Sequence, residues 1–312
     1  MKHFLDIADL SAEEIKNLLT LGVKLKTEQK SGLFRPIFKN KVLAMVFQKP
    51  SLRTRVSFDM AMRTLGGDAL YLSPQEIGLG KRESIADVAR VLSGYVQVVM
   101  ARVFAHEHIL ELAKWSDVPI INGLSDYNHP CQAMADALTI YEEFGDLNGL
   151  NVSYIGDGNN VAVSLMKIVT KLGADFRIAN PEDYDMPKDD IEQSKGFAKI
   201  SGGSVTLLRD PEAAAEEADV IYTDTWTSMG QEEEAKKRER VFPPYQVNQE
   251  LVKLAKPTSI VMHCLPAHRG QEITNEVADG PHSRLFVQGE NRMHAQKAIL
   301  VELLLGGDPD AR

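Results

Sequence analysis

The sequence VLAMVF (Val42–Phe47) and, a few residues later, SLRTR (Ser51–Arg55) decide the fold that we expect for this chain. The first run is apolar throughout, as in a strand buried inside a sheet. Pro50 ends the strand, and the apolar residues Phe58 and Met62 that follow are spaced as on one face of a helix. A buried strand that leads directly into a helix is typical of an α/β protein with a parallel sheet.

The junction between this strand and helix also suits an oxyanion. The backbone N–H groups at the start of the helix, and the positive end of its dipole, would lie beside the hydroxyl and guanidinium groups of residues 51–55. Phosphate is a ligand for such a place. A solvated basic turn has the same composition. On this run alone the turn is the better interpretation, because most short arginine-containing runs are surface helix starts.

The composition favours a globular protein in a reducing compartment. The 312 residues suffice for two domains, and 44% hydrophobic with 25% charged residues is usual for a soluble protein. No run is apolar for long enough to span a bilayer, and Asp6 lies where a secretory signal would be apolar. With two cysteines, Cys131 and Cys264, and no spacing typical of structural zinc, we expect a cytoplasmic protein without a metal. The net charge of -9 disfavours nucleic acid as a partner.

Apolar runs and helical patterns alternate from residue 42 onward, which predicts parallel sheets. In the first half we expect strands at 42–47, 96–100 and 119–121 and helices at 84–94, 106–115 and 130–144. In the second half we expect strands at 152–155, 176–179, 205–208, 220–222 and 259–262. The charged run 231–240 is expected to form an exposed helix with charge pairs.

Turn residues at 145–149 mark a boundary between two domains. We therefore expect an α/β fold of two domains, each with a central parallel sheet flanked by helices. The first domain covers residues 1–147 and the second covers residues 148–289. A closing helix within residues 290–312 is expected to pack back onto the first domain.

Four further motifs lie where open parallel sheets bind ligands, beyond the carboxyl ends of the strands. The first, His129-Pro130-Cys131-Gln132, begins a helix, because proline suits the first turn. His129 and Gln132 are three residues apart and could both hydrogen-bond one carbonyl ligand. An ordinary helix start with Cys131 as a small buried residue is the plainer interpretation.

The second motif, GDGNNV (Gly156–Val161), matches only part of the glycine-rich dinucleotide fingerprint. Val161 stands where a small residue is needed, and Ala179-Asn180-Pro181 after the next strand lacks the acidic residue that holds a ribose. We therefore expect no nicotinamide cofactor. Asn159 or Asn160 could instead hydrogen-bond a substrate.

The third motif, DTWTSMG (Asp224–Gly230), could bind the ammonium and polar groups of an amino acid, or could be a plain loop capped by Asp224. The fourth motif is HCLP (His263–Pro266). Its Cys264 could be a nucleophile with His263 as base, a substrate contact, or a buried thiol. Neighbouring residues on a strand point to opposite faces, so we favour the substrate contact.

Together the motifs S-x-R-T-R, H-P-x-Q and H-C-L-P resemble, in order and spacing, those of the aspartate and ornithine carbamoyltransferase family. The last, with D-x-x-x-S-M-G, is similar to the ornithine branch of that family. The similarity covers nearly the whole chain, including Asn122–Asp126 and Glu290–Arg292. Each motif alone is weak, but several in register are specific.

The resemblance implies an enzyme of arginine metabolism that assembles as a homotrimer or a multiple of trimers. It would transfer the carbamoyl group of carbamoyl phosphate to the δ-amine of L-ornithine, giving L-citrulline and phosphate, without a cofactor. The first domain would bind carbamoyl phosphate and the second ornithine. The implied catalytic residues are Arg102, His129, Asp224 and Cys264. Carbamoyl phosphate would be bound by Ser51, the Leu52 backbone, Arg53, Thr54, Arg102, His129, Gln132, Cys264, Leu265 and Arg292. Ornithine would be bound by Asn160, Asp224, Ser228 and Met229.

The resemblance also gives expectations for three single positions. Leu52 replaces the usual threonine, but the implied contact is its backbone N–H, so we expect little loss. Gly78 stands where related enzymes often carry a glutamine or histidine that reaches a neighbouring subunit. The Leu265–Pro266 peptide bond is similar to one that is cis in this family.

Two alternatives remain open at this point. A related carbamoyltransferase would act on another amine, such as acetylornithine or putrescine. From a different class of protein, a non-catalytic scaffold could keep the same fold and only bind an anion.

Overall fold

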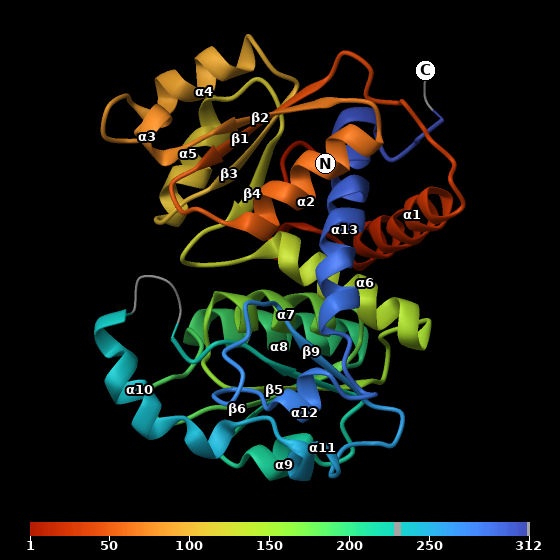
Figure 1. Ribbon diagram of the computed structural model, residues 1–312, viewed down its shortest axis with the longest axis vertical. Helices are drawn as coiled ribbons and strands as arrows, with labels where there is room; N and C mark the ends of the chain where they lie inside the picture. The colour runs from red at the N-terminus through yellow and green to blue at the C-terminus, as the bar shows by residue number, and fades with distance from the viewer. Residues whose placement is uncertain (228–231, 311–312) are drawn as a thin grey trace. The chain divides into compact units, whose positions relative to one another are not determined.

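The computed structural model describes residues 1–227 and 232–310, and the chain divides into two compact units. The first unit consists of Met1–Leu138 and Glu290–Arg312, and the second of Thr139–Gly289. Each unit contains one parallel sheet flanked by helices (Figure 1). The predicted fold class is therefore confirmed. Among the described residues, none of the helices combines the length and the apolar content that crossing a bilayer requires.

The sheet of the first unit has four parallel strands in the order β2-β1-β3-β4. They are β1 (Val42–Phe47), β2 (Asp68–Leu72), β3 (Val98–Arg102) and β4 (Ile120–Leu124). β1 has the predicted bounds, because its apolar run is buried between two neighbouring strands. β3 and β4 begin and end later than predicted. The apolar pattern does not predict β2, an edge strand whose side chains are exposed or half-buried.

Helices lie on both faces of this sheet (Figure 1). They are α1 (Ala12–Lys30), α2 (Leu52–Thr64), α3 (Pro74–Ile77), α4 (Ile85–Ser93), α5 (His106–Trp115), the first part of α6 (Pro130–Phe144) and the last part of α13 (Leu285–Leu305), after the short 3-10 turn η1 (Ile7–Asp9). Ala44 and Val46 of β1 share an apolar cluster with α4 and α5. Side chains alternate along a strand, so the neighbours of these two residues face the other side of the sheet. The sheet is thereby held from both faces.

The second unit has five parallel strands in the order β7-β6-β5-β8-β9. They are β5 (Asn151–Ile155), β6 (Asp175–Ala179), β7 (Ser204–Leu208), β8 (Val220–Thr223) and β9 (Ile260–His263). Each observed end lies within one residue of the predicted end. The other elements that belong to this unit alone are α7 (Asn160–Lys171), α8 (Lys188–Ser201), α9 (Pro211–Ala215), η2 (Glu232–Glu234), α10 (Ala235–Val241), η3 (Pro243–Tyr245), α11 (Gln249–Val252) and α12 (Asn275–Ala278).

The strand order reverses once in each sheet, between β1 and β3 and between β5 and β8. At such a switch point the connections that leave the two strands diverge, which leaves room for a ligand beyond their carboxyl ends. Ser51–Arg55 follows β1 and Arg102 ends β3. Asn159 follows β5 and Asp224 follows β8. The topology therefore places the sequence motifs at the two switch points.

The charged run 231–240 differs from expectation. Arg238 on α10 is only 4% exposed, so the prediction of an exposed helix is wrong for this residue. Its guanidinium pairs with Asp157 at 2.7 Å and with Glu234 at 3.1 Å. An arginine in a charged run looks solvated from the sequence, because its partner Asp157 lies far away along the chain.

Candidate active site

Helix α2 begins directly at the predicted oxyanion run. Ser51 is its N-cap, and its Oγ accepts a hydrogen bond from the Thr54 backbone N–H at 3.3 Å. The Ser51 hydroxyl also donates to Thr54 Oγ1 at 3.1 Å. The first turn of a helix leaves backbone N–H groups without an intrahelical acceptor, and Leu52 is in that turn. The Leu52 side chain is 76% exposed, so leucine here leaves the backbone donor in place.

Two buried guanidinium groups converge on Thr54. Arg102, at the end of β3, and Arg292, on α13, donate to Thr54 Oγ1 at 3.5 Å and 2.9 Å respectively. Both arginines are more than nine-tenths buried, and Thr54 is fully buried. Arg53 adds a third guanidinium, whose Nε is buried and has no hydrogen-bond partner among the described residues. Buried positive charge at a helix N-terminus favours an oxyanion, so we prefer that interpretation to the solvated turn.

His129 and Gln132 lie at the start of α6, and both are buried. Burial, and then the charges of Arg292 and Arg102, hold the pKa of His129 well below its usual value. The imidazole is therefore neutral at physiological pH and offers one N–H donor. Gln132 donates to Asp136 at 2.8 Å, and its Oε1 is buried without a partner in the part of the chain that the structure describes. Both side chains can thus serve a small polar ligand.

Cys131, between these two residues, has a structural role. Its Sγ donates to the Asn122 carbonyl at 3.3 Å, and burial raises its pKa to about 12. A thiol with such a pKa is not a nucleophile at neutral pH. The interpretation of Cys131 as a small buried residue is confirmed.

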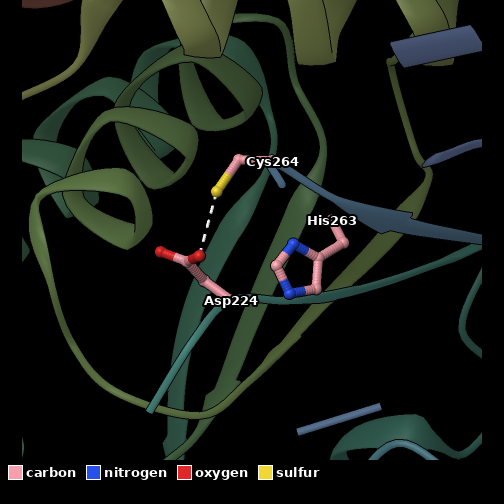
Figure 2. Close-up of side chains that lie close together, drawn as sticks. All are labelled: Asp224, His263 and Cys264. Atoms are coloured by element: carbon pink, nitrogen blue, oxygen red, sulfur yellow. Dashed lines mark hydrogen bonds between the residues drawn. The ribbon is translucent and has the colours of Figure 1, made fainter. Parts of the chain in front are cut away.

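Asp224, just after β8, accepts several hydrogen bonds within the second unit. Its Oδ1 accepts from Cys264 Sγ at 2.9 Å, the bond drawn in Figure 2, and from the Thr225 N–H at 2.7 Å. Its Oδ2 accepts from Asn159 Nδ2 at 2.8 Å. Within residues 1–227 and 232–310 no lysine or arginine forms an ion pair with it, although it is only 7% exposed. The carboxylate is therefore oriented by neutral donors, and no lysine or arginine of the described residues neutralises it.

Asn159 connects this carboxylate to α7. It is the N-cap of α7, and its Oδ1 accepts from the backbone N–H groups of Val161 and Ala162 at 2.9 Å and 3.1 Å. Asn160, the residue we expect to contact ornithine, is the first residue of the helix. The sequence alone does not decide which of the two asparagines contacts a substrate. The preference for asparagine at an N-cap is the signal that could have identified Asn159 as the residue that orients Asp224.

His263 and Cys264 have different hydrogen-bond partners, and of the two only Cys264 is bonded to Asp224 in Figure 2. The imidazole of His263 bonds Glu272 Oε1 through Nε2 at 3.0 Å and accepts the Leu265 N–H at Nδ1 at 2.9 Å. Both ring nitrogens are therefore engaged, and His263 is not positioned as a base for Cys264. Asp224, His263 and Cys264 have ligand atoms within 4.8 Å of one another, a spacing that a metal ion could use. In the structure Cys264 donates to Asp224, while His263 contacts Glu272 and the Leu265 N–H.

The chain turns sharply after Cys264. The Leu265–Pro266 peptide bond is cis, as the resemblance implied, and Leu265 itself has a φ of 57°. Ser228 and Met229, two of the expected ornithine contacts, lie outside the described residues.

The chain is similar to known proteins over nearly its whole length. Residues 2–142 match the carbamoyl-P binding domain, and residues 148–303 the Asp/Orn binding domain, of aspartate/ornithine carbamoyltransferase. The chain belongs to the aspartate/ornithine carbamoyltransferase family. A relative from Pyrococcus abyssi, named ornithine carbamoyltransferase, is 54% identical over 306 residues, which are 98% of this chain and 96% of the relative.

Two proteins from Pyrococcus furiosus support this family assignment. A relative named ornithine carbamoyltransferase, anabolic, is 54% identical over 306 residues, or 98% of this chain and 97% of the relative. A solved structure of ornithine carbamoyltransferase from the same organism superposes with a TM-score of 0.95 at 53% identity and covers 98% of both chains.

Gly78 has a backbone conformation that suits glycine. It ends α3 with a φ of 50°, a left-handed conformation that glycine adopts readily. A Cβ added there would lie 2.8 Å from Arg82 Cβ. The local conformation of this member of the family therefore favours glycine at this position.

Asp157 and Arg238 are functional candidates that sequence reasoning missed. Arg238 Nη1 donates to Asp157 Oδ2 at 2.7 Å and to the Trp226 carbonyl at 2.8 Å, so it ties α10 both to the turn after β5 and to the loop after β8. Burial raises the pKa of Asp157 to about 6, although Arg238 acts in the opposite direction. Asp224 and Glu234 raise it further. This ion pair therefore supports the loop that begins at Asp224.

Replacing Arg238 by glutamine should raise the pKa of Asp157 above about 6, because the guanidinium is the main influence that lowers it. Titration of the Asp157 carboxyl carbon by NMR measures the pKa. Lys236→Gln removes the same charge from an exposed position of α10 and serves as control. An Asp157 pKa that is equal in both variants would contradict the assignment.

The raised pKa of Asp157 also determines whether its contribution to stability increases or decreases with pH. An unperturbed aspartate carboxyl has a pKa of 3.8, whereas Asp157 in the folded protein has a pKa of about 6, so the folded state binds the proton more tightly. Between these two pH values, the contribution of Asp157 to the free energy of unfolding therefore increases as the pH falls.

Proposed function

We propose that this protein is an ornithine carbamoyltransferase, which converts carbamoyl phosphate and L-ornithine into L-citrulline and phosphate. The observation that carries this proposal is the convergence of Arg102 and Arg292 on Thr54 at the start of α2. Thr54 and Arg102 lie in the part of the chain that matches a carbamoyl-P binding domain, and Arg292 lies in the part that matches an Asp/Orn binding domain. The names of the relatives support ornithine as the second substrate.

The first unit is proposed to bind carbamoyl phosphate. Its phosphate would accept hydrogen bonds from Ser51, Arg53, Thr54 and the backbone N–H of Leu52, with charge neutralised by Arg102. The carbamoyl group would be held by His129, Gln132 and Arg292. We keep 1–147 as the functional first domain and 148–289 as the second, with the helix in 290–312 returning Arg292 to the first unit.

The second unit is proposed to bind ornithine. The Asp224 carboxylate, oriented by Asn159 and Cys264, can accept hydrogen bonds from an amine. Asn160 would hydrogen-bond the amino-acid backbone of ornithine. Ser228 and Met229 are assigned by the sequence motif alone.

The proposed reaction requires a neutral amine, because an alkylammonium has no lone pair. Its pKa is about 10, so the δ-amine of ornithine is mostly protonated near pH 7 and must lose a proton first. The neutral nitrogen then attacks the carbamoyl carbon, and the carbonyl oxygen becomes an oxyanion. The carbonyl re-forms as the carbon–oxygen bond to phosphate breaks, and the extra proton on the attacking nitrogen passes to the departing phosphate. The charge of Arg102 and the N–H of neutral His129 would stabilise the oxyanion. No covalent intermediate with the protein is needed.

The purified protein should form a ureido product from carbamoyl phosphate and L-ornithine, and much less from acetylornithine or putrescine. A colorimetric citrulline assay with parallel release of phosphate measures this. Preference for another amine would assign the chain to a related carbamoyltransferase. Phosphate release that does not depend on any amine would support the non-catalytic scaffold.

Arg102→Ala and Arg53→Ala should each lower kcat for citrulline formation at least about a hundredfold, as is typical when one donor to a developing oxyanion or phosphate is lost. Arg90→Ala removes an exposed arginine that stacks on Trp115 and should leave kcat unchanged. Near-normal turnover by either of the first two variants would exclude the proposed site.

We also propose assembly as a homotrimer or a multiple of trimers. Leu52 and Val56 are four residues apart on α2 and are 76% and 49% exposed. Such a stripe of exposed apolar side chains is typical of a surface that another protein covers. Val56→Glu should therefore shift the mass measured by light scattering from that of a multiple of three chains to that of one. An unchanged mass would show that this stripe is not the interface.

A cytoplasmic location and a role in arginine biosynthesis complete the proposal. Both cysteines are thiols, which suits a reducing compartment, and one relative is named anabolic. Fractionation of cells that produce the protein tests the location.

A further inference from the structure

The first unit contains a cavity of about 310 Å³ that is separate from the residues assigned to carbamoyl phosphate. It lies at the C-terminal end of α2, about 16 Å along the helix axis from Arg53. Its volume is at the lower end of the range for small-molecule sites. The residues that line it are Leu25, Glu28, Gln29, Gly32, Leu33, Phe34, Arg35, Met60, Arg63, Thr64, Leu65 and Lys297.

Much of the wall is apolar. Leu33 and Phe34, in the connection after α1, are 51% and 61% exposed, and Met60 on α2 is 40% exposed. Leu25 and Leu65, which also line the cavity, are buried. Large apolar side chains that remain exposed around a cavity favour a ligand with an apolar body.

Two of the three cations at the cavity already have carboxylate partners. Arg35 donates from Nε and Nη2 to Glu28 at 2.7 Å and 2.9 Å, and from Nη1 to Asp310 at 2.5 Å. Arg63 donates from Nε to Asp59 at 2.5 Å. These charges are therefore neutralised within the protein.

Lys297 on α13 differs from both arginines. It is 1% exposed, its Nζ donates to the neutral amide oxygen of Gln29, and no carboxylate within residues 1–227 and 232–310 pairs with it. Burial lowers its pKa to about 8, so the amine is still mostly protonated at pH 7. A buried ammonium without an anionic partner is costly, and an anion in the cavity beside it would offset that cost.

We propose that this cavity binds a small amphipathic monocarboxylate, with its carboxylate beside Lys297 and its apolar body against Leu33, Phe34 and Met60. The apolar wall argues against an inorganic anion, and the buried ammonium argues against a neutral hydrocarbon. The site is independent of the proposed transferase reaction, and its test does not use citrulline formation.

Octanoate and octanamide are a matched pair of probes, because they share the apolar chain and differ in charge. In calorimetric titrations of the purified full chain at pH 7, octanoate should bind at one site at least about tenfold more tightly than octanamide. Lys297→Met should remove this difference, whereas Lys297→Arg should keep it. Lys114→Met, which removes an exposed lysine of the same unit, should leave both affinities unchanged.

If Lys297→Met does not fold, the affinities of the unaltered protein for octanoate and octanamide still test the proposal. Equal affinities for octanoate and octanamide would show a plain apolar cavity and overturn the proposal. Absence of saturable octanoate binding, or binding that Lys297→Met leaves intact, would overturn it as well. Competition by inorganic phosphate at the same concentration as octanoate would show a simple anion site instead.

Discussion

The first unit depends on one buried hydroxyl, that of Thr54. Its Oγ1 accepts hydrogen bonds from Ser51, Arg102 and Arg292, which come from a strand–helix junction, a strand end and the C-terminal helix. Buried guanidinium groups repel one another and are costly to desolvate, so they are held together only if the fold fixes each of them. The parallel sheet does so for Arg102, and α13 does so for Arg292. The positive charge beside α2 is therefore built by the fold before any anion binds. Burial, and then this charge, lower the pKa of His129 and keep it neutral.

The second unit uses the opposite arrangement. Asp224 is a buried carboxylate surrounded by neutral donors from Asn159, Cys264 and the Thr225 backbone. Hydrogen bonds from neutral groups orient a carboxylate without cancelling its charge, which leaves it able to attract an ammonium. Arg238 on α10 contacts the Trp226 carbonyl in the loop after Asp224, but its guanidinium forms an ion pair with Asp157. Each unit thus presents charge of the sign that its proposed substrate lacks: positive for a phosphate and negative for an amine.

The sequence predicts the parts of this protein that follow from local patterns. Buried strands such as β1 read as unbroken apolar runs, and Pro130 marks the start of α6. The edge strand β2 is not predicted, because its side chains are exposed or half-buried and its sequence shows neither strict alternation nor an apolar run. The ion pair between Arg238 and Asp157 is not predicted, because 81 residues separate the partners along the chain. For the same reason Arg292, 238 residues from Thr54, was assigned through the family resemblance and not from periodicity.

Helix α13 carries two buried cations, Arg292 and Lys297, whose burial cost is offset in different ways. Arg292 and Lys297 are five residues apart, so they leave the helix about 140° from one another and face different surroundings. A guanidinium cannot lose its proton in a protein, so Arg292 stays charged, and hydrogen bonds such as that to Thr54, together with a bound anion, offset its burial cost. Lys297 can release its proton, and burial already brings its pKa to about 8. An anion bound beside either residue stabilises the folded state by mass action. Since both residues lie on one continuous helix within the first unit, each such anion stabilises the element that carries the other charge.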